Sequence, residues 1–268
     1  MFYKIKCNLL KIFNFFLKYF RVYVDHSISK SKIHKLINLI KPHDLGFKLV
    51  RFGSKNDGGY LIPNILDSIS ACFSAGVGNN TEFEKHLKEK NLNIFLADGT
   101  IKKNNKLKKF NFLKKNLSSY SDKKNITLTE WVDNNNIKKK NNLLLKLDIE
   151  GSEYEVIHSV PQNYLKMFKV IIIEFHYLEK LNNILNYKIF FNCFKKILIN
   201  FEVAHIHPNN CQGYYVVAGE KFPAALEVSF LRKDICKYKK NIFSLPNSLD
   251  SKNIEKNPDV VLPKNRFS

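Results

Sequence analysis

Apolar runs separated by helical patterns fill the middle of the chain. Four runs of five to seven residues are typical of strands buried on both faces: 68–74, 93–97, 143–147 and 169–175. Stretches with helical periodicity lie between them, and another follows at about 183–199. This alternation, from residue 68 to residue 200, predicts an α/β protein with a mixed, mostly parallel sheet and helices on both faces.

Three helices begin at residues that favour helix N-termini. Glu84 follows Thr81 by three positions and Glu155 follows Ser152 in the same way, which predicts a capping box at each start. Thr129 is expected to cap a helix that runs to about residue 135.

The two ends of this region add further strands. The sequence predicts one strand at 47–52, a short one at 110–113, and three more without intervening helices at 201–207, 214–218 and 226–230. The last three suggest antiparallel additions at one edge of the sheet. We expect three parts of the chain: an amphipathic helical extension (1–45), the α/β domain (46–232) and an irregular, polar tail (233–268).

The first 24 residues predict an amphipathic helix. Polar residues fall on one stripe at about 100° per residue, with aromatic and aliphatic residues around the rest; these polar residues are Lys4, Lys11, Asn14, Lys18 and Arg21. The charges leave no run of 18 uncharged residues for a membrane span, and no small-residue cleavage site follows. We expect the helix to dock on the inner membrane surface or on a partner chain, or to pack on its own domain or a dimer mate.

Composition narrows the function classes. The chain has 268 residues, with 44 Lys and Arg against 24 Asp and Glu, a formal charge of +20. Such charge favours phosphate-bearing substrates or anionic lipid, although Lys and Asn also rise together in AT-rich genomes. Only four of these cations are Arg, which argues against nucleic acid as a partner. Five cysteines without a C-x-x-C pair argue against a disulfide framework and a zinc finger, so we expect a reducing, cytoplasmic location.

Glycines mark the candidate site. Seven of the ten lie in four short segments, three of which end or follow a predicted strand: 51–60, 74–79, 98–100 and 148–153. Gly76-x-Gly78 between a strand and a helix is typical of a nucleotide-binding turn. Asp98 ends the next strand, where a carboxylate can accept hydrogen bonds from both ribose hydroxyls. A dinucleotide fingerprint would place a third glycine where Thr81 stands, so S-adenosylmethionine (SAM) is favoured over NAD.

Several segments resemble the FkbM-like class I SAM-dependent O-methyltransferases. They are SAGVGNNTEFE, LADGT, LLLKLDIEGSEYEVI and VIIIEFH, with K-x-D-x-E-G-x-E the most specific piece. DGGY, AHIHPNN and FPAALEVSF are similar to the branch that modifies capsule sugars. The resemblance covers about 47–232. It implies a Rossmann-like sheet of about seven strands, SAM as methyl donor with S-adenosylhomocysteine as product, and a hydroxyl acceptor.

The turn and strand ends supply the expected cofactor-binding residues. Ser74 stands where the family often has an acid, so contact to the amino group of SAM is expected from Asp148 or Asp57 instead. The full expected set is Asp57, Gly59, Tyr60, Ser74, Gly76, Gly78, Asp98, Gly99 and Asp148.

Methyl transfer to a sugar hydroxyl requires removal of the hydroxyl proton, so a base is expected. His176 is the first candidate, because Glu174 lies two residues before it on the same face of its strand. His207 and Asp148 are the alternatives. The expected substrate-binding residues are Glu150, Glu174, His205, Asn209 and Asn210. Glu153 is expected to face solvent or to cap its helix.

No metal is required for this chemistry. Mg²⁺ is nonetheless an option, because the chain offers hard oxygen ligands at Asp148, Glu150, Glu174, Asn209 and Asn210.

These observations predict a cytoplasmic SAM-dependent O-methyltransferase. Association with the inner membrane and assembly into a homo-oligomer are two further options that the sequence leaves open. Its expected acceptor is a hydroxyl of a nucleotide-linked or capsular sugar, such as a GDP-heptose-like compound. Two alternatives stay open: methylation of a phosphoramidate or another small phosphorylated capsule precursor, and a non-catalytic scaffold with a SAM-binding fold.

Overall fold

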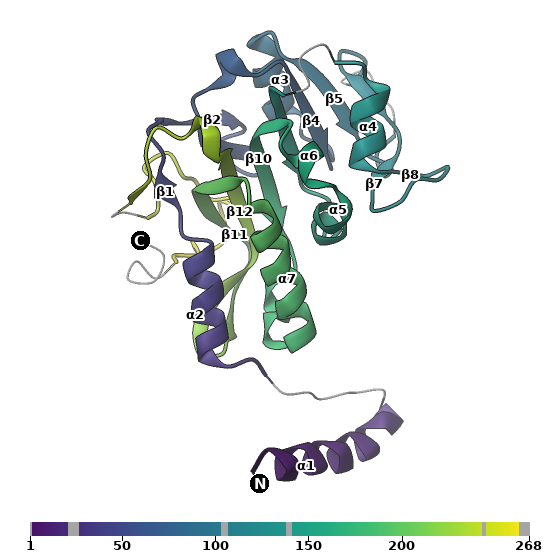
Figure 1. Cartoon of the computed structure of the whole chain (residues 1–268), viewed down its shortest axis with the longest axis vertical. Coiled ribbons are helices and arrows are strands. Elements are labelled where there is room, and N and C mark those ends of the chain that lie inside the picture. Colours follow the sequence, from purple (N-terminus) through teal and green to yellow (C-terminus); the bar gives the residue numbers. More distant parts are fainter. Residues whose placement is uncertain (1, 21–26, 103–106, 138–140, 243–244, 263–268) are drawn as a thin grey trace.

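A seven-stranded sheet forms the centre of the protein (Figure 1). The computed structural model describes residues 2–20, 27–102, 107–137, 141–242 and 245–262. The strands, in their order across the sheet, are β11 (Phe201–Val217), β12 (Glu220–Arg232), β10 (Phe168–Phe175), β9 (Leu143–Leu147), β4 (Ala71–Ala75), β5 (Asn93–Ala97) and β6 (Asn111–Leu113). β12 pairs antiparallel with both of its neighbours, and the other pairs are parallel. The expected fold class, a mixed and mostly parallel sheet of seven strands with an antiparallel addition at one edge, is confirmed.

The strand order reverses between β4 and β9. β5 and β6 follow β4 on one side, while β9 and β10 extend the sheet on the other side. In open α/β sheets the carboxyl ends of the strands at such a reversal form the usual ligand crevice. Gly76 follows β4 and Asp148 follows β9, so this crevice lies where the glycine turn and the acidic motif meet.

Five helices cover one face of the sheet. They are α2 (Lys30–Leu39), α4 (Leu128–Asn134), α5 (Glu153–Ser159), α6 (Gln162–Leu165) and α7 (Ile184–Ile197). Their apolar residues pack with inward-facing strand residues in one large core, in which the ring of Phe73 on β4 lies 4.9 Å from that of Trp131 on α4. The single Trp is therefore a packing residue.

The opposite face is covered by α3 (Glu82–Glu89) and by a hairpin of β2 (Leu49–Gly53) and β3 (Gly59–Pro63). The expected strand at 47–52 therefore belongs to this separate hairpin, and the turn at Asp57–Gly58 joins its two strands. Ser229 on β12 ties the hairpin to the sheet, because its hydroxyl donates to the carbonyl oxygen of Leu61 at 2.6 Å.

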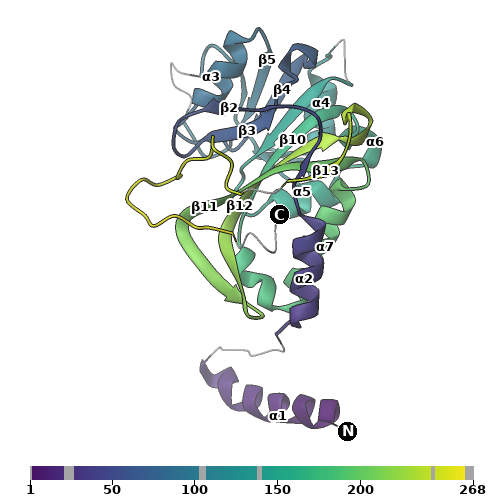
Figure 2. The same ribbon diagram turned by 90° about the vertical axis from the view of Figure 1, so that its left-hand side faces the viewer.

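Shorter elements complete the chain. They are α1 (Phe2–Leu17), the 3-10 turns at Lys18–Phe20, Leu66–Ser68, Leu178–Asn182 and Lys233–Ile235, the pair β1 (His43–Asp44) and β13 (Lys240–Asn241), and the pair β7 (Asn116–Leu117) and β8 (Asn125–Ile126). Figures 1 and 2 both show α1 apart from the body, beyond the end of α2. None of the helices in the described part of the chain combines the length and apolarity that a membrane crossing requires.

The predicted capping boxes are wrong in both cases. Neither Thr81 nor Ser152 accepts a cap hydrogen bond with its side chain. Glu84 turns into the core, where the Ser74 hydroxyl donates to it at 2.6 Å. Buried polar groups need a partner, and this need outweighs the local capping geometry. α4 begins two residues earlier than expected, with Thr127 as its cap.

The strands predicted at 201–207 and 214–218 are one long strand, β11. Its register against β12 shifts between Asn209 and Tyr214. A bulge of this kind lets a strand continue past polar and glycine residues that the sequence pattern marks as a break. The segment 245–262 then returns along β11 and β12 and contacts both (Figure 2).

Candidate functional site

The turn after β4 brings two strands into close contact. Gly76 has a φ of +74° and Gly78 a φ of +54°. A Cβ on Gly76 would lie 1.6 Å from the carbonyl oxygen of Asp148, so only glycine fits between the ends of β4 and β9. A Cβ on Gly78 would meet no atom within 4 Å. The first glycine therefore permits the close approach, and the second leaves the backbone open to a cavity.

Asp98 at the end of β5 braces this turn. Its Oδ2 accepts hydrogen bonds from the amides of Val77 at 3.0 Å and Gly78 at 3.1 Å, and its Oδ1 accepts from the Thr100 hydroxyl at 2.6 Å. Burial alone would raise the pKa of Asp98, but these bonds and the amides of Thr100 and Ile101 outweigh burial and hold the pKa below its usual value. The carboxylate is therefore ionised and lies beside the open turn, and its expected contact with a ribose stays a prediction.

A cavity of about 540 Å³ opens in front of the turn. We call it the glycine-turn cavity. Five of the expected cofactor-binding residues line it: Asp57, Gly76, Gly78, Asp98 and Asp148. Gly59, Tyr60, Ser74 and Gly99 are not among its lining residues. Sequence reasoning missed Asn116, Ser118 and Tyr120, which line the cavity from β7 and the loop after it, where no glycine or strand-end acid marks them.

A second cavity, of about 350 Å³, adjoins the first. We call it the His176 cavity. Glu174, His176 and Asn209 line it together with residues of the tail. Asp57, Asp148 and Glu150 line both cavities, so the two chambers meet at three carboxylates.

Glu153 orients the ring of His176. Glu153 Oε1 lies 2.9 Å from His176 Nδ1 and also accepts from the amides of Ile149 at 3.0 Å and Gly151 at 3.2 Å. Because Oε1 already acts as the acceptor of two backbone amides, we assign the proton of this hydrogen bond to Nδ1, which donates it to Glu153. Glu153 is completely buried, so it does not face solvent. The two amides that it accepts precede α5, so it does not cap that helix either. The residue that supports His176 most directly is therefore Glu153 rather than Glu174.

The other nitrogen of His176 faces oxygens only. Nε2 lies 3.8 Å from Asp148 Oδ1, 3.7 Å from Glu150 Oε2 and 3.7 Å from Glu174 Oε1, all too far for a hydrogen bond. Burial lowers the pKa of His176, but the hydrogen bond that its Nδ1–H donates to Glu153 and the charges of the surrounding carboxylates outweigh burial and raise the pKa to about 9. Nε2 is thus a basic atom at the wall of a polar cavity.

Glu174 is a buried acid with a raised pKa. Burial and the nearby charge of Asp148 raise its pKa to about 8, although His176 and the amide of Asn209 act in the opposite direction. Asn209 donates to Glu174 Oε1 at 2.8 Å. Glu174 thus lies beside His176, as the sequence predicted, and lines the His176 cavity together with Asn209.

Asp148 is held from the core side. Tyr60 donates its hydroxyl to Asp148 Oδ2 at 3.2 Å, and Lys146 Nζ lies 3.2 Å from the same oxygen and 2.6 Å from the carbonyl oxygen of Gly76. Burial lowers the pKa of Lys146, but the carboxylates of Asp148 and Glu84 more than compensate, so this buried lysine stays charged. Lys146 is also the first residue of the K-x-D-x-E-G-x-E segment, in which Asp148 follows it by two positions.

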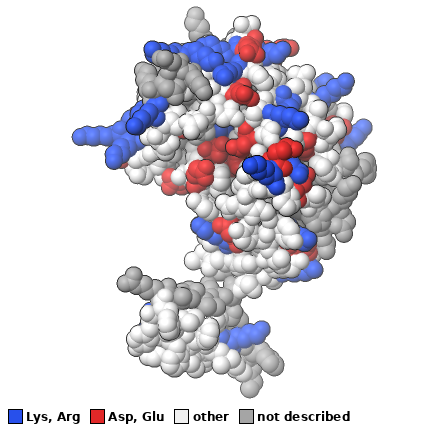
Figure 3. All heavy atoms as spheres, turned by 180° about the vertical axis from the view of Figure 1, so that it is seen from behind, with Lys and Arg blue, Asp and Glu red and all other residues white. Residues whose placement is uncertain are grey.

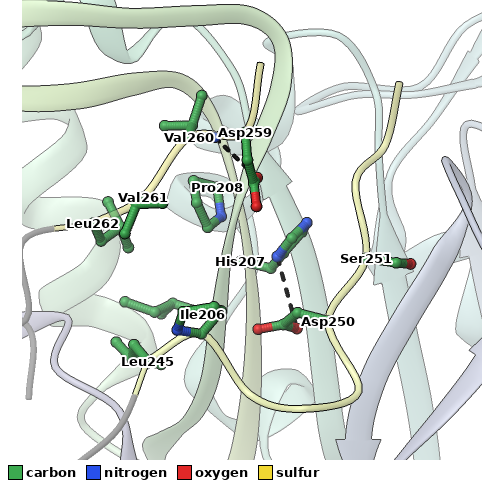
Figure 4. A pocket seen from close by; sticks show the side chains of 11 residues that line it. Ile206, His207, Pro208, Leu245, Asp250, Ser251, Asp259, Val260, Val261 and Leu262 are labelled. Atoms are coloured by element: carbon green, nitrogen blue, oxygen red, sulfur yellow. Dashed lines mark hydrogen bonds and ion pairs between the residues drawn. The ribbon is translucent and has the colours of Figure 1, made fainter. Parts of the chain in front are cut away.

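His205, His207 and Asn210 bind the tail. His205 Nε2 lies 2.9 Å from Asp250 Oδ1, and His207 Nε2 lies 3.2 Å from Asn253 Oδ1. Figure 4 shows His207 facing Asp250 in a separate pocket between β11 and the tail. Asn210 exchanges hydrogen bonds with the backbone of Ile254. None of these three residues is among those that line the His176 cavity.

The tail closes one wall of the His176 cavity. Asn253 and Ile254 line it. The Asn253 amide donates to Glu227 Oε1 at 2.6 Å, which anchors the segment to β12. Sequence reasoning described this segment as irregular and polar, and the pattern gave no sign that it reaches the site.

One group of the described residues has a geometry that would admit a metal ion. Asp148, Glu174 and His176 each offer one ligand atom, and these atoms lie within 4.8 Å of one another. The expectation that no metal is required stays a prediction.

Comparison with known protein families identifies the family to which this chain belongs. Residues 51–207 match the family model described as the methyltransferase FkbM domain, which is more than half of the chain. A search of curated proteins finds no relative. The matched range contains all four glycine segments and His176. The chain belongs to the FkbM methyltransferase family and is a methyltransferase.

Proposed function

We propose that this methyltransferase uses SAM to methylate a hydroxyl group of a nucleotide-linked or capsular sugar. The observation that carries the proposal is the pair of adjoining cavities, which share Asp57, Asp148 and Glu150. Transfer between two bound molecules requires that their reacting atoms be held together. One chamber offers a glycine turn beside an ionised carboxylate, and the other offers a basic nitrogen.

The glycine-turn cavity fits a nucleoside with a cationic end. Its volume lies within the range of about 300–1,000 Å³ that is common for small-molecule sites. The open backbone at Gly78 and the carboxylate of Asp98 suit an adenosine, and the shared carboxylates favour a positive charge over a neutral or negative one. These features support SAM rather than NAD.

His176 is the proposed base. Bound SAM supplies a methyl group on a sulfonium, and the acceptor oxygen bonds to that carbon as the carbon–sulfur bond breaks. Nε2 of His176 accepts the hydroxyl proton. Glu153 holds Nδ1–H and stabilises the imidazolium that results. Glu174 and Asn209 position the hydroxyl by hydrogen bonding.

The acceptor is inferred from polarity and charge. The His176 cavity presents carboxylate and amide groups, which pair with sugar hydroxyls. Figure 3 shows acidic side chains near the middle of one face and Lys and Arg around its upper part. Together with the net charge of +20, this favours a sugar that carries phosphate, and a GDP-heptose-like compound is the first candidate.

The test is transfer of a deuterated methyl group from SAM to a panel of acceptors, followed by mass spectrometry. The panel contains nucleotide sugars, free capsular sugars and small phosphorylated or phosphoramidate compounds. The proposal predicts a labelled methyl ether on a sugar, equally in EDTA and in MgCl₂. Methyl transfer to a phosphoramidate nitrogen or to a phosphate would show that the acceptor is a small phosphorylated precursor and not a sugar hydroxyl. Loss of turnover in EDTA with recovery in Mg²⁺ would assign Asp148, Glu174 and His176 to a metal. Absence of SAM binding would favour the scaffold.

A further inference from the structure

The apolar face of α1 lies open. Six aliphatic and aromatic side chains of α1 and the following turn are between 48% and 77% exposed: Ile5, Leu9, Ile12, Phe13, Phe16 and Phe20. Figures 1 and 2 show the helix apart from the body, and Figure 3 shows it as a largely uncharged surface with lysines on it. We call these six residues the α1 apolar face. Exposed patches of this kind mark interaction sites.

The opposite side of α1 is basic. Lys11, Asn14 and Lys18 lie on one stripe of the helix, and the sequence places Lys4 on the same stripe. Residues 2–20 contain no acidic residue. The ammonium of Lys18 lies 4.1 Å from the ring centre of Phe15, so its stem follows the apolar surface while its charge stays in water. The helix thus combines an aromatic and aliphatic face with a basic stripe on its other side.

We propose that α1 docks on an anionic lipid bilayer and lies in the plane of its surface. A helix with Lys on one face and Phe and Leu on the other is typical of binding at the level of the lipid headgroups. The helix does not meet the requirements for a membrane crossing, so it lies on the bilayer rather than through it. The charge of the helix complements anionic headgroups.

The net charge of the chain also argues against a second copy of the protein as the partner that covers the α1 apolar face. A dimer formed through α1 would bring together two chains that each carry a formal charge of +20. An anionic bilayer removes that repulsion and covers the aromatic face in the same step. The inference is independent of the proposed acceptor and of the proposed base.

The test is co-sedimentation of the full-length protein with lipid vesicles. Vesicles of phosphatidylcholine alone are compared with vesicles containing about a third phosphatidylglycerol, each at low and at high NaCl. We expect binding to the anionic vesicles that falls at least tenfold on neutral vesicles and weakens at high salt, because surface charge is screened.

Two double variants separate the apolar face from general effects of added charge. F13E/F16E should lose at least tenfold in binding, whereas F13L/F16L should retain it because the apolar area remains. I199E/L249E is the matched control, since it adds the same charge at exposed aliphatic residues of the body and should bind as wild type. Unchanged melting temperatures show that the variants fold. Failure of the wild type to sediment with anionic vesicles overturns the proposal. So does a lipid-free dimer, detected by ultracentrifugation, that F13E/F16E dissociates.

Discussion

Nδ1 of His176 lies 2.9 Å from Oε1 of Glu153, a carboxylate without exposed surface. The same oxygen accepts two backbone amides from the turn between β9 and α5, while Oε2 has no hydrogen-bond partner among the residues that the structure describes. Burying a carboxylate in this way costs stability unless it is well bonded. The arrangement fixes the orientation of the imidazole and directs Nε2 toward Asp148 and Glu174, where we place the reacting hydroxyl.

Glu153→Gln should shift the pH dependence of methyl transfer. Glu153 raises the pKa of His176, and a base must be unprotonated to act. Wild-type kcat/KM should therefore rise with pH, with a midpoint near pH 9, and level off only above it. Without the carboxylate charge the rise should move to lower pH by about 1 to 3, with a lower plateau because the imidazolium is less stabilised. The pH profile of initial rates measures this.

Glu84→Gln is the control for that profile. Glu84 is also a buried acid with one unpartnered oxygen, but it bonds to Ser74 and lines neither cavity. The Glu84→Gln variant should therefore leave the midpoint of the pH profile unchanged. An unshifted profile in Glu153→Gln with a normal melting temperature would show that Glu153 has only a structural role.

His176→Ala should separate the base from the tail-bound histidines. General base catalysis contributes about 10²- to 10⁴-fold, so kcat should fall by that factor at saturating acceptor. His207→Ala should retain kcat within a few-fold and lower the melting temperature instead, because His207 bonds to Asn253 of the tail. The reverse result would move the base to His207.

Glu174→Gln should stabilise the protein at alkaline pH. The pKa of Glu174 is about 8 in the folded protein, above its ordinary 4.5, so the folded state prefers the protonated acid. Glu174 therefore contributes its full share to the free energy of unfolding below about pH 4.5, where it is protonated in both states. This contribution falls as the pH rises and is lost once the pH has passed about 8. Gln keeps the carbonyl that accepts from Asn209.

Thermal melts at pH 5 and pH 9 test this. The gain of Glu174→Gln over wild type should be a few degrees larger at pH 9, since about 1 kcal/mol corresponds to about 2–4 °C in a protein of this size. Glu130→Gln, at an exposed acid, should give equal differences at both pH values. If the gain in melting temperature of Glu174→Gln does not depend on pH, the raised pKa of Glu174 is contradicted.

Gly76→Ala should disrupt the crevice itself. Its Cβ would lie 1.6 Å from a backbone oxygen, so the ends of β4 and β9 must separate. We expect a lower melting temperature and at least tenfold weaker binding of S-adenosylhomocysteine. Gly213→Ala is the matched control, because Gly213 also has a positive φ but open space around its Cβ. Equal effects of both substitutions on binding would mean that the close contact is unimportant.

The central strands of the sheet could be predicted because each is a continuous apolar run, which is typical of a strand buried on both faces. β5 and β9 begin and end at the residues expected from NIFLA and LLLKL. Helix starts were less predictable. Glu84 and Glu155 fit a local capping pattern, yet one bonds to Ser74 and the other to Ser118, because tertiary partners were available.

The parts of the site near strand ends could be predicted, and the rest could not. Asp98, Asp148 and His176 follow or end buried strands, which places them at one edge. Glu153 was misread because only the three-dimensional turn brings its side chain back under His176. The partners of His205 and His207 lie about 45 residues further along the chain, in a segment without periodic pattern.

Binding of S-adenosylhomocysteine, measured by isothermal titration calorimetry on wild type and Asp98→Ala, tests the central claim most directly. Asp98 is ionised and lies at the open turn of the glycine-turn cavity. The account predicts one site in the wild type and at least tenfold weaker binding in a folded Asp98→Ala. Absence of binding in the wild type, or equal affinity in the two proteins, would contradict it.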